Sequence, residues 1–186
     1  TEPGIAIVIP RANAVNGEAV NFQAKNNTFT DAISVAIAIA AEEGAAAYPE
    51  IVGNQFNNTG AGIVNTITAS IDAEANWWGA STGPAAGKIS GNVDATPWCG
   101  DAACTFTVSS IGAEGEIILP ENAEPQNVQA AINAVPEGST IVIPAGTIQL
   151  VDENHKGFEI TTPNLTIKLS DGTIVQNSSP CFTINA

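Results

Sequence analysis

The sequence predicts an all-β protein built as a β-solenoid, in which the chain winds through successive coils of short strands. Two observations lead to this prediction. An asparagine stands just ahead of an aromatic residue at Asn27-Thr28-Phe29, Asn54-Gln55-Phe56 and Asn76-Trp77-Trp78, and these sites are 27 and 22 residues apart. In the second half of the chain, Phe158 and Phe182 have a spacing of 24 residues. Repeats with periods in this range are typical of solenoids and propellers.

The composition agrees with short strands joined by tight turns. Ala, Ile and Val supply most of the 44% hydrophobic residues, and 17 glycines and 11 prolines suit turns. Five Lys and Arg residues against 19 Asp and Glu residues give a net charge of −14. Nucleic acid or an anionic membrane would need a cationic surface, so neither is expected as a partner. We interpret the acidity as self-repulsion of an extracellular protein.

Metal binding and membrane insertion are not expected. Calcium is the minor alternative explanation of the acidity, because the sequence holds neither an EF-hand loop nor a Gly-Gly-x-Gly-x-Asp repeat. We therefore predict no cofactor.

The apolar run 33–41 is too short to span a bilayer and is expected to be a buried strand. No signal peptide is visible, so Thr1 is expected to be a mature or repeat-unit boundary.

The first half should begin with a strand at 5–9, which Pro10 ends, and a second strand at 19–24 after a turn at 13–17. The segment 40–48 contains two glutamates and an alanine run. We expect it to form a helical turn or a loop that bulges from one coil, because insertions in solenoids collect on one face.

Stacked coils bring equivalent residues above one another. We therefore expect Asn27, Asn54 and Asn76 to form a hydrogen-bonded ladder, with the aromatic residues stacked inside. Chance recurrence in an Asn-rich chain is the alternative, and the matching β-like flanks of the third copy argue against it. The core of a closing coil is expected to be filled by the three tryptophans, Trp77, Trp78 and Trp98.

The cysteines predict one disulfide. Cys99 and Cys104 enclose four residues, a loop short enough to be clipped in an extracellular protein, whereas Cys181 has no partner nearby in the sequence. Metal ligation would need more Cys or His close by, and the single histidine, His155, is expected in an exposed turn.

The second half is expected to start a new series of strands, interrupted by one helix at 124–135. Pro125 suits the first turn of this helix, and its apolar residues recur at helical spacing. Pro136-Glu137-Gly138 should end it. An amphipathic helix with a narrow apolar stripe must cover an apolar surface, and the end of a solenoid is such a surface. Strands are expected at 106–108, 116–119, 157–161, 164–169, 172–175 and 181–184, and residues 139–148 are expected to form a strand, a turn and a second strand.

Two segments resemble a known family. Residues 126–148, QNVQAAINAVPEGSTIVIPAGTI, resemble the N-terminal cap and first coil of pectate-lyase-like right-handed parallel β-helices. Residues 76–98, with the pattern NWWG, GP and DATPW, are similar to the C-terminal coil of β-helix repeat proteins of bacterial and archaeal cell surfaces. The resemblance implies a right-handed parallel β-helix with one short capping helix near 124–135.

The two resembling segments stand in inverted order along the chain. Residues 1–98 are interpreted as later coils and a closing coil, 99–104 as a Cys-clipped junction, and 105–186 as a cap and early coils. A tandem array, completion by neighbouring subunits, or circular permutation within a monomer would each explain this order. In the first two, copies meet head-to-tail and can propagate as a filament. Roughly seven coils are expected at the strand spacing of a sheet. The expected junction residues are Ile5, Ile7, Ile9, Phe182 and Ile184.

We therefore predict a secreted structural protein rather than an enzyme. Its expected partner is itself, in an extracellular filament or surface layer. The alternative is a polysaccharide-active, lyase-like or carbohydrate-binding β-helix, for which Asp72 and Glu74 offer a carboxylate pair on one strand face. Such a pair is more often a solvated face. The scattered cations do not form a basic cluster that lyase chemistry would use; they are Arg11, Lys25, Lys88, Lys156 and Lys168.

Ice binding and glycosylation are supported by weaker motifs. Ice binding would use Thr-x-Thr ladders, but Thr66-Ile67-Thr68 and Thr105-Phe106-Thr107 are isolated. Glycosylation would use the Asn-x-Ser/Thr sequons of Asn26, Asn57, Asn164 and Asn177. Asparagine is also common in solenoid turns without a glycan.

Overall fold

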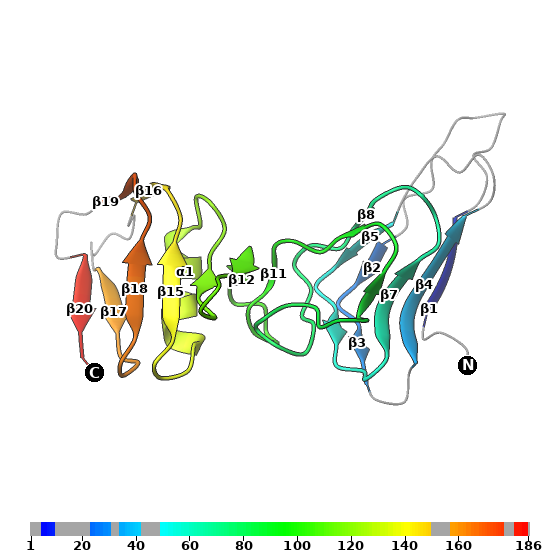
Figure 1. The fold of residues 1–186 in the computed structure, drawn as a ribbon, viewed down its shortest axis with the longest axis horizontal. Coiled ribbons are helices and arrows are strands. Elements are labelled where there is room, and N and C mark those ends of the chain that lie inside the picture. The colour runs from blue at the N-terminus through cyan, green and yellow to red at the C-terminus, as the bar shows by residue number, and fades with distance from the viewer. Residues whose placement is uncertain are drawn as a thin grey trace. The chain divides into compact units, whose positions relative to one another are not determined.

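The computed structural model describes residues 5–9, 23–30, 34–41, 49–149, 157–176 and 181–185, and it divides into two compact units, residues 1–104 (unit 1) and 105–186 (unit 2). Both units consist mostly of short strands, with one short helix in unit 2 (Figure 1). The strands form a parallel β-solenoid of about 5 turns, which confirms the predicted fold class. There are fewer turns than the predicted seven, partly because some coils exceed the 24-residue spacing of Phe158 and Phe182: in-register residues are 32 apart at Ile5 and Ile37 and 27 apart at Gln23 and Glu50.

Unit 1 is a stack of coils, each contributing a strand to successive sheets. Its strands are β1 (Ile5–Ile9), β2 (Gln23–Lys25), β3 (Thr28–Phe29), β4 (Val35–Ala41), β5 (Glu50–Val52), β6 (Gln55–Phe56), β7 (Ala61–Asn65), β8 (Ile71–Asp72), β9 (Ile89–Ser90), β10 (Val93–Asp94) and β11 (Trp98–Cys99). The first sheet has the order β1-β4-β7-β9, the second β2-β5-β8-β10, and the third β3-β6. Gln55 of β6 makes one further parallel bridge to Trp77.

The registers of unit 1 place like residues above one another. Ile37 of β4 pairs with Ile63 of β7, and both side chains are fully buried. Side chains of a strand alternate between the two faces, so one face of each strand fills the interior of the coil. The predicted buried strand at 33–41 is observed as β4, where Ile37 and Ile39 lie in the core.

Unit 2 has the same plan. Its strands are β12 (Thr107–Val108), β13 (Ser110–Ile111), β14 (Ile117–Ile118), β15 (Thr140–Ile143), β16 (Gly146–Gln149), β17 (Phe158–Ile160), β18 (Thr166–Leu169), β19 (Thr173–Gln176) and β20 (Phe182–Ile184). Three of its sheets have the orders β13-β14-β15-β18, β16-β19 and β17-β20. The pair β13 and β14 is antiparallel, whereas the later pairs are parallel.

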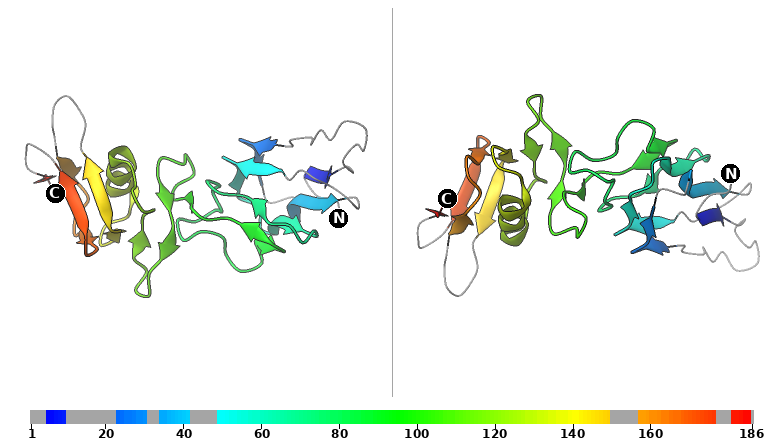
Figure 2. Two further views of the ribbon diagram at one scale, coloured as in Figure 1. Left: turned by 90° about the horizontal axis from the view of Figure 1, so that it is seen from above. Right: turned by 90° about the horizontal axis from the view of Figure 1, so that it is seen from below.

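The single helix of the described chain, α1 (Pro125–Ala134), lies where the sequence predicts it. Its buried residues, Val128, Ala131 and Ile132, form one stripe, and Figure 2 shows the helix beside β15 in both views. The Gln129 side chain reaches β17: its Nε2 donates to the Glu159 carbonyl at 2.9 Å, and its Oε1 accepts from the Glu159 N–H at 2.8 Å. The Gln129 amide thus makes with the Glu159 backbone the two hydrogen bonds that a neighbouring strand would otherwise make with β17.

Candidate functional site: the stacked coils and their ends

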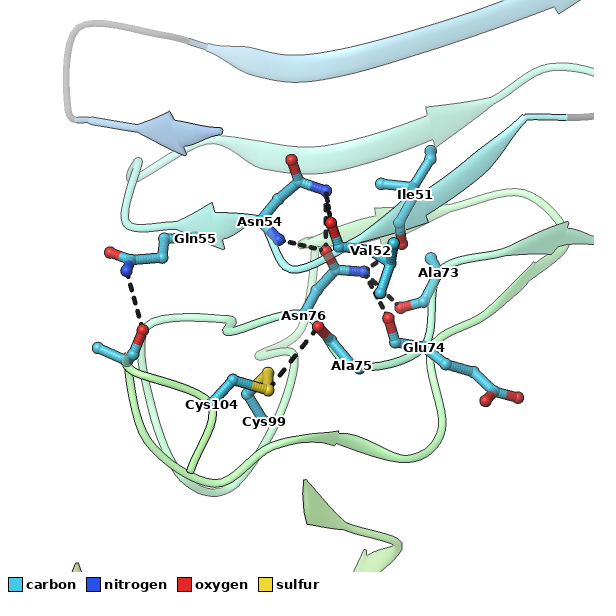
Figure 3. The surroundings of a disulfide bond; sticks show 11 residues. Ile51, Val52, Asn54, Gln55, Ala73, Glu74, Ala75, Asn76, Cys99 and Cys104 are labelled. Atoms are coloured by element: carbon cyan, nitrogen blue, oxygen red, sulfur yellow. Dashed lines mark hydrogen bonds between the residues drawn. A yellow bond between two sulfur atoms is a disulfide. The ribbon is translucent and has the colours of Figure 1, made fainter. Parts of the chain in front are cut away.

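The three asparagines of the predicted ladder are hydrogen-bonded in series. Asn54 Oδ1 accepts from the N–H and the Nδ2 of Asn27, at 3.0 and 2.9 Å. Asn76 Oδ1 accepts in the same way from the N–H and the Nδ2 of Asn54, at 2.8 and 3.0 Å (Figure 3). Asn54 and Asn76 are almost completely buried. Each carboxamide therefore joins its own coil to the preceding one.

The amide nitrogens of the ladder satisfy buried carbonyl groups at the corner of the coil. Asn76 Nδ2 donates to the carbonyls of Ile51 and Ala73 at 2.6 and 2.7 Å, and Asn54 Nδ2 donates to the carbonyl of Ala24 at 2.8 Å. A buried carbonyl without such a partner would destabilise the fold. The asparagines are thus structural polar groups of the interior.

The residue before each ladder asparagine has a positive φ. The values are 58° at Asn26, 69° at Gly53 and 48° at Ala75. This left-handed conformation turns the chain sharply and directs the next side chain inward. A corner residue, an asparagine and an aromatic two positions later therefore form the repeating unit, of which the sequence reveals only the last two parts.

Aromatic rings stack through the core beside the ladder. The ring centroids of Phe29 and Phe56 are 5.3 Å apart with an interplanar angle of 4°, and those of Phe56 and Trp78 are 4.5 Å apart at 19°. Gly62 makes room for the indole, because a Cβ on this glycine would lie 2.8 Å from a ring carbon of Trp78. The expected interior stack of aromatics is therefore present.

The three tryptophans do not share one role, in contrast to the prediction. Trp78 and Trp98 are buried, but Trp77 is half-buried and its Nε1 donates to Asn57 Oδ1 on the surface at 3.1 Å. The reason is the alternation of faces along an extended chain, which turns Trp77 outward between Asn76 and Trp78. Among the described residues, the Nε1 of Trp78 is the one buried side-chain polar atom without a hydrogen-bond partner.

The disulfide between Cys99 and Cys104 is confirmed. Its loop folds back on the coil that contains Asn76: the Cys99 N–H donates to the Asn76 carbonyl at 3.0 Å, and Gln55 Nε2 donates to the Ala102 carbonyl at 2.8 Å (Figure 3). The Sγ of Cys104 lies 3.9 Å from the Ala75 carbonyl oxygen. The disulfide loop therefore covers the end of the asparagine ladder.

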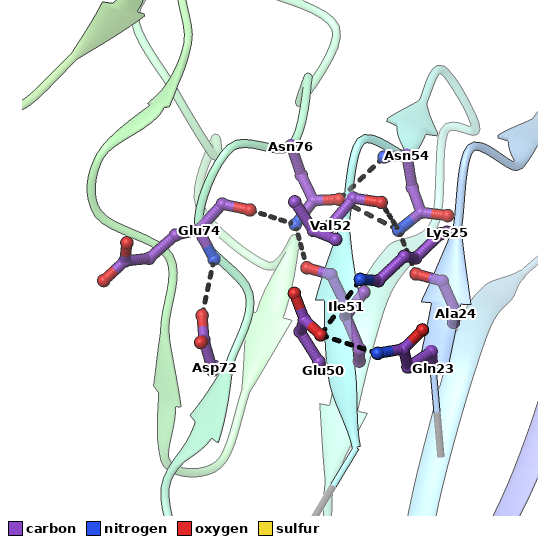
Figure 4. Close-up of polar contacts among 10 residues, drawn as sticks. All are labelled: Gln23, Ala24, Lys25, Glu50, Ile51, Val52, Asn54, Asp72, Glu74 and Asn76. Carbon is purple, nitrogen blue, oxygen red and sulfur yellow. Dashed lines mark hydrogen bonds and ion pairs between the residues drawn. The ribbon is translucent and has the colours of Figure 1, made fainter. Parts of the chain in front are cut away.

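A row of acidic side chains follows the outer face of the second sheet. Asp72 is in register with Glu50 and with Asp94. Glu50 forms an ion pair with Lys25 at 3.0 Å (Figure 4). The pKa of Glu74 is raised above its ordinary value of 4.5, chiefly because neighbouring protein atoms displace some of the water around its carboxylate and also because of the negative charges of Asp72 and Asp94.

The carboxylate pair of the enzymatic alternative lies in this row. Asp72 and Glu74 are both exposed, and Asp72 Oδ1 accepts the Glu74 N–H at 3.2 Å, as in a turn stabilised by its own side chain. Over the described residues, no group of three or more His, Cys, Asp or Glu side chains is arranged to hold a metal ion. The arrangement is that of a solvated sheet face.

The last described coil of unit 2 has uncovered core positions. Leu169 of β18 is in register with Ile143, which is 1% exposed, yet Leu169 is itself 47% exposed. Ile184 of β20 is in register with half-buried Ile160 and is 74% exposed. In the described part of the chain, β18, β19 and β20 are edge strands of their sheets. Over the described residues, the last coil of unit 2 therefore has an apolar face and unpaired strand edges.

The other predicted junction residues lie on two edge strands. Ile5, Ile7 and Ile9 belong to β1 and are in register with Ile37, Ile39 and Ala41 of β4, while β1 is at the edge of its sheet. Phe182 is half-buried, and its ring centroid lies 5.7 Å from that of Phe158.

Three of the four sequon asparagines are exposed, namely Asn26, Asn57 and Asn164. Asn164 Nδ2 donates to Glu137 Oε1 at 2.8 Å. The fourth, Asn177, lies outside the described residues, as do Arg11, His155 and Lys156.

Several structural polar residues have no signal in the sequence. Lys88 Nζ donates to the backbone carbonyl of Asn58, 30 residues away, and Asn58 is 2% exposed. Asn65 is 4% exposed, and its Nδ2 donates to the carbonyls of Ala69 and Asn92. These residues close turns between coils. Each of them occurs in a single coil, so no repeat in the sequence marks it.

Comparison of the chain with protein-family models, with curated proteins and with solved structures finds no match. Within the described residues, none of the helical structure is long and apolar enough to cross a membrane.

Proposed function

We propose that the chain is a secreted structural protein whose copies join head-to-tail by stacking of solenoid coils. The copies are either separate subunits or repeats of one polypeptide, and the product is an extracellular filament or surface layer. The observation that carries the proposal is the uncovered last coil of unit 2, where Leu169 and Ile184 stand at core positions but are 47% and 74% exposed.

An apolar coil end with unpaired strand edges favours the addition of another coil. Completing the burial of a residue such as Ile184 contributes about 1.5–3 kcal/mol, and an added strand also pairs the edge of the sheet. The fitting partner is a coil with strands in the same three sheets. The edge strands β1, β2 and β3 of unit 1 supply such a coil.

In each unit, the end of the solenoid away from the proposed joint is covered by other parts of the chain. Only one end of each unit is therefore available for stacking, which gives the contact a direction. The disulfide loop covers the coil of Asn76 in unit 1, and in unit 2 the Gln129 amide occupies the edge of β17. The contact would therefore be heterologous, with different surfaces on the two copies, and such contacts propagate into filaments unless a ring closes.

Further support concerns location and family. A disulfide between Cys99 and Cys104 suits an oxidising compartment outside the cytoplasm. The β-solenoid and the positions of α1 and the NWWG segment agree with the proposed kinship to pectate-lyase-like β-helix repeat proteins of cell surfaces.

Sedimentation and electron microscopy of two variants test the proposal. Ile184→Asp should abolish end-to-end assembly, because it places a charge in the joint, while the far-UV circular dichroism stays that of the wild type. The control is Thr183→Asp, an exposed position of the same strand that faces outward; it should assemble. Monodisperse wild-type particles of single-chain length at high concentration would contradict the proposal.

A further inference from the structure

We infer that β18 of one copy pairs in parallel with β1 of the next, in the register that sets Ile167 opposite Ile7. The inference deepens the proposed function and rests on it. It names the two strands that meet across the joint, and so identifies the partner surface as the edge of the first sheet of a second copy of this chain.

A repeated heptapeptide is the first observation that carries the inference. Residues 4–10 read GIAIVIP and residues 138–144 read GSTIVIP, so five of the seven positions are identical. The first copy of the motif contains β1 and the second contains β15, which lie in different units. Strands with the same pattern of residues stack above one another in a solenoid, so β1 is suited to the sheet that contains β15.

The corner before the strand fixes how the motif stacks on its neighbour. In unit 2, Ile141 of β15 is in register with Ile167 of β18. A residue with positive φ stands three positions before each of these isoleucines, Gly138 at 77° and Asn164 at 54°. Successive coils of this sheet therefore enter their strands through a left-handed residue at the same distance.

The N-terminal copy of the motif has a glycine at this distance. Gly4 stands three positions before Ile7, and glycine adopts the left-handed conformation without strain. Aligning this glycine with the left-handed residues of unit 2 sets Ile7 opposite Ile167. Ile9 then lies opposite Leu169, which is 47% exposed in a single copy. The register therefore supplies an apolar neighbour to an uncovered core position.

Within the described residues, both strands present an unpaired edge. β18 is the last strand of the order β13-β14-β15-β18, and β1 is the first strand of the order β1-β4-β7-β9. The two sheets are equivalent, since β18 follows the strand of Phe158 as β4 follows the strand of Phe29. The two backbones can therefore pair without the opening of either sheet.

Only slips by an even number of residues compete with this register, because a slip by one residue would turn the core face of a strand outward. Ile7 is in register with Ile39, which is buried. Leu169 is in register with Ile143, which is also buried. A slip by two residues keeps the faces matched but moves the left-handed corners of successive coils out of line. The corners thus select one register from the even series.

Disulfide trapping between two differently tagged variants in assembled material tests the register. Both variants carry Cys181→Ser; one carries Thr166→Cys and the other Ala6→Cys, the positions just before the paired isoleucines. Residues paired on neighbouring strands have Cα atoms about 4.8 Å apart, within the range of a disulfide, whereas an offset of two residues gives about 8 Å. Mild oxidation should cross-link this pair at least about tenfold faster than either offset mixture, Thr166→Cys with Val8→Cys or Lys168→Cys with Ala6→Cys.

The outcomes separate the inference from the proposed function. A mixture of Ala6→Cys with Ser110→Cys, which is exposed on β13 at the opposite edge of the sheet of β18, gives the rate of random collision. Faster trapping in either offset mixture would overturn the register. Trapping of all three mixtures at the collision rate in sedimented material would overturn the pairing of β18 with β1 and leave head-to-tail assembly in place. Absence of wild-type assemblies in the sedimentation experiment would instead refute the proposed function.

Discussion

At the scale of single residues, the buried asparagines are the polar framework of unit 1. Asn54 and Asn76 each accept two hydrogen bonds from the preceding coil and donate to backbone carbonyl groups at the corner of the coil. Removing such a side chain leaves several buried groups without partners, which costs more than the loss of one hydrogen bond. The protein should therefore be more sensitive to loss of the buried Asn54 side chain than to loss of the half-buried Asn27 side chain.

Asn54→Ala should destabilise the protein by about 2–4 kcal/mol, because both the N–H of Asn27 and the carbonyl of Ala24 lose their partner. Chemical denaturation measures the effect. Asn27→Ala is the matched control at the end of the ladder, where the side chain is half-buried, and it should cost less. Equal losses for the two variants would argue against a cooperative ladder.

Glu74 makes the free energy of unfolding depend on pH. Since its pKa is raised in the folded state by partial loss of hydrating water and by the charges of Asp72 and Asp94, the folded protein holds this proton more tightly than the unfolded chain does. The stabilising contribution is therefore complete below the ordinary pKa of 4.5 and is lost as the pH rises through the raised value.

Glu74→Gln should consequently raise the melting temperature at pH 7 relative to the wild type, and this advantage should vanish below about pH 4.5. Thermal melts over this pH range measure it. Glu121→Gln, at an exposed turn of unit 2, is the control. An advantage of Glu74→Gln that persists unchanged at low pH would mean that charge is not its cause.

At the scale of elements, α1 acts as more than an apolar cover. Gln129 supplies a donor and an acceptor to the backbone of Glu159, so the helix both buries the core and completes the edge of β17. An uncovered edge would be open to pairing with other chains.

Gln129→Ala should therefore destabilise unit 2 by about 1–2 kcal/mol, because the Glu159 N–H and carbonyl lose their partner. Hydrogen exchange of the Glu159 amide, followed by NMR, should accelerate. Gln126→Ala removes the same side chain from an exposed position of the same helix and is the control. Unchanged exchange at Glu159 in Gln129→Ala would show that the amide contact is dispensable.

The elements also show what could be read from the sequence. The ladder and the aromatic stack were predictable, since the solenoid places equal residues above one another and Asn-x-aromatic therefore recurs. The left-handed residue before each asparagine could not be predicted, because Asn26, Gly53 and Ala75 share a backbone conformation but not a side chain. Trp77 was misplaced because adjacent tryptophans look alike in a sequence, although they must point to opposite faces of an extended chain.

At the scale of the whole molecule, charge opposes the proposed assembly. Each chain carries a net charge of −14, so copies that stack end to end repel one another until salt screens the charges. The apolar joint at Leu169 and Ile184 must outweigh this repulsion. Assembly should therefore respond to ionic strength in the direction opposite to that of an interface held by ion pairs.

Raising NaCl from 0.01 to 0.15 M shortens the Debye length from about 30 to about 8 Å and should increase the sedimenting fraction of the wild type. Light scattering at fixed protein concentration follows the change. The Ile184→Asp variant should stay unassembled at both concentrations. Dissolution of the wild-type assemblies by added salt would contradict an apolar joint.

The corner unit of a left-handed residue, an asparagine and an aromatic has one further consequence. Successive corners of unit 1 are 27 and 22 residues apart, yet their asparagines make the same bonds. Each coil therefore sets its own alignment, and the length of chain between two corners is free to vary. Such a scaffold should tolerate foreign peptides spliced between its corners, and the solenoid would display them at regular intervals along its axis.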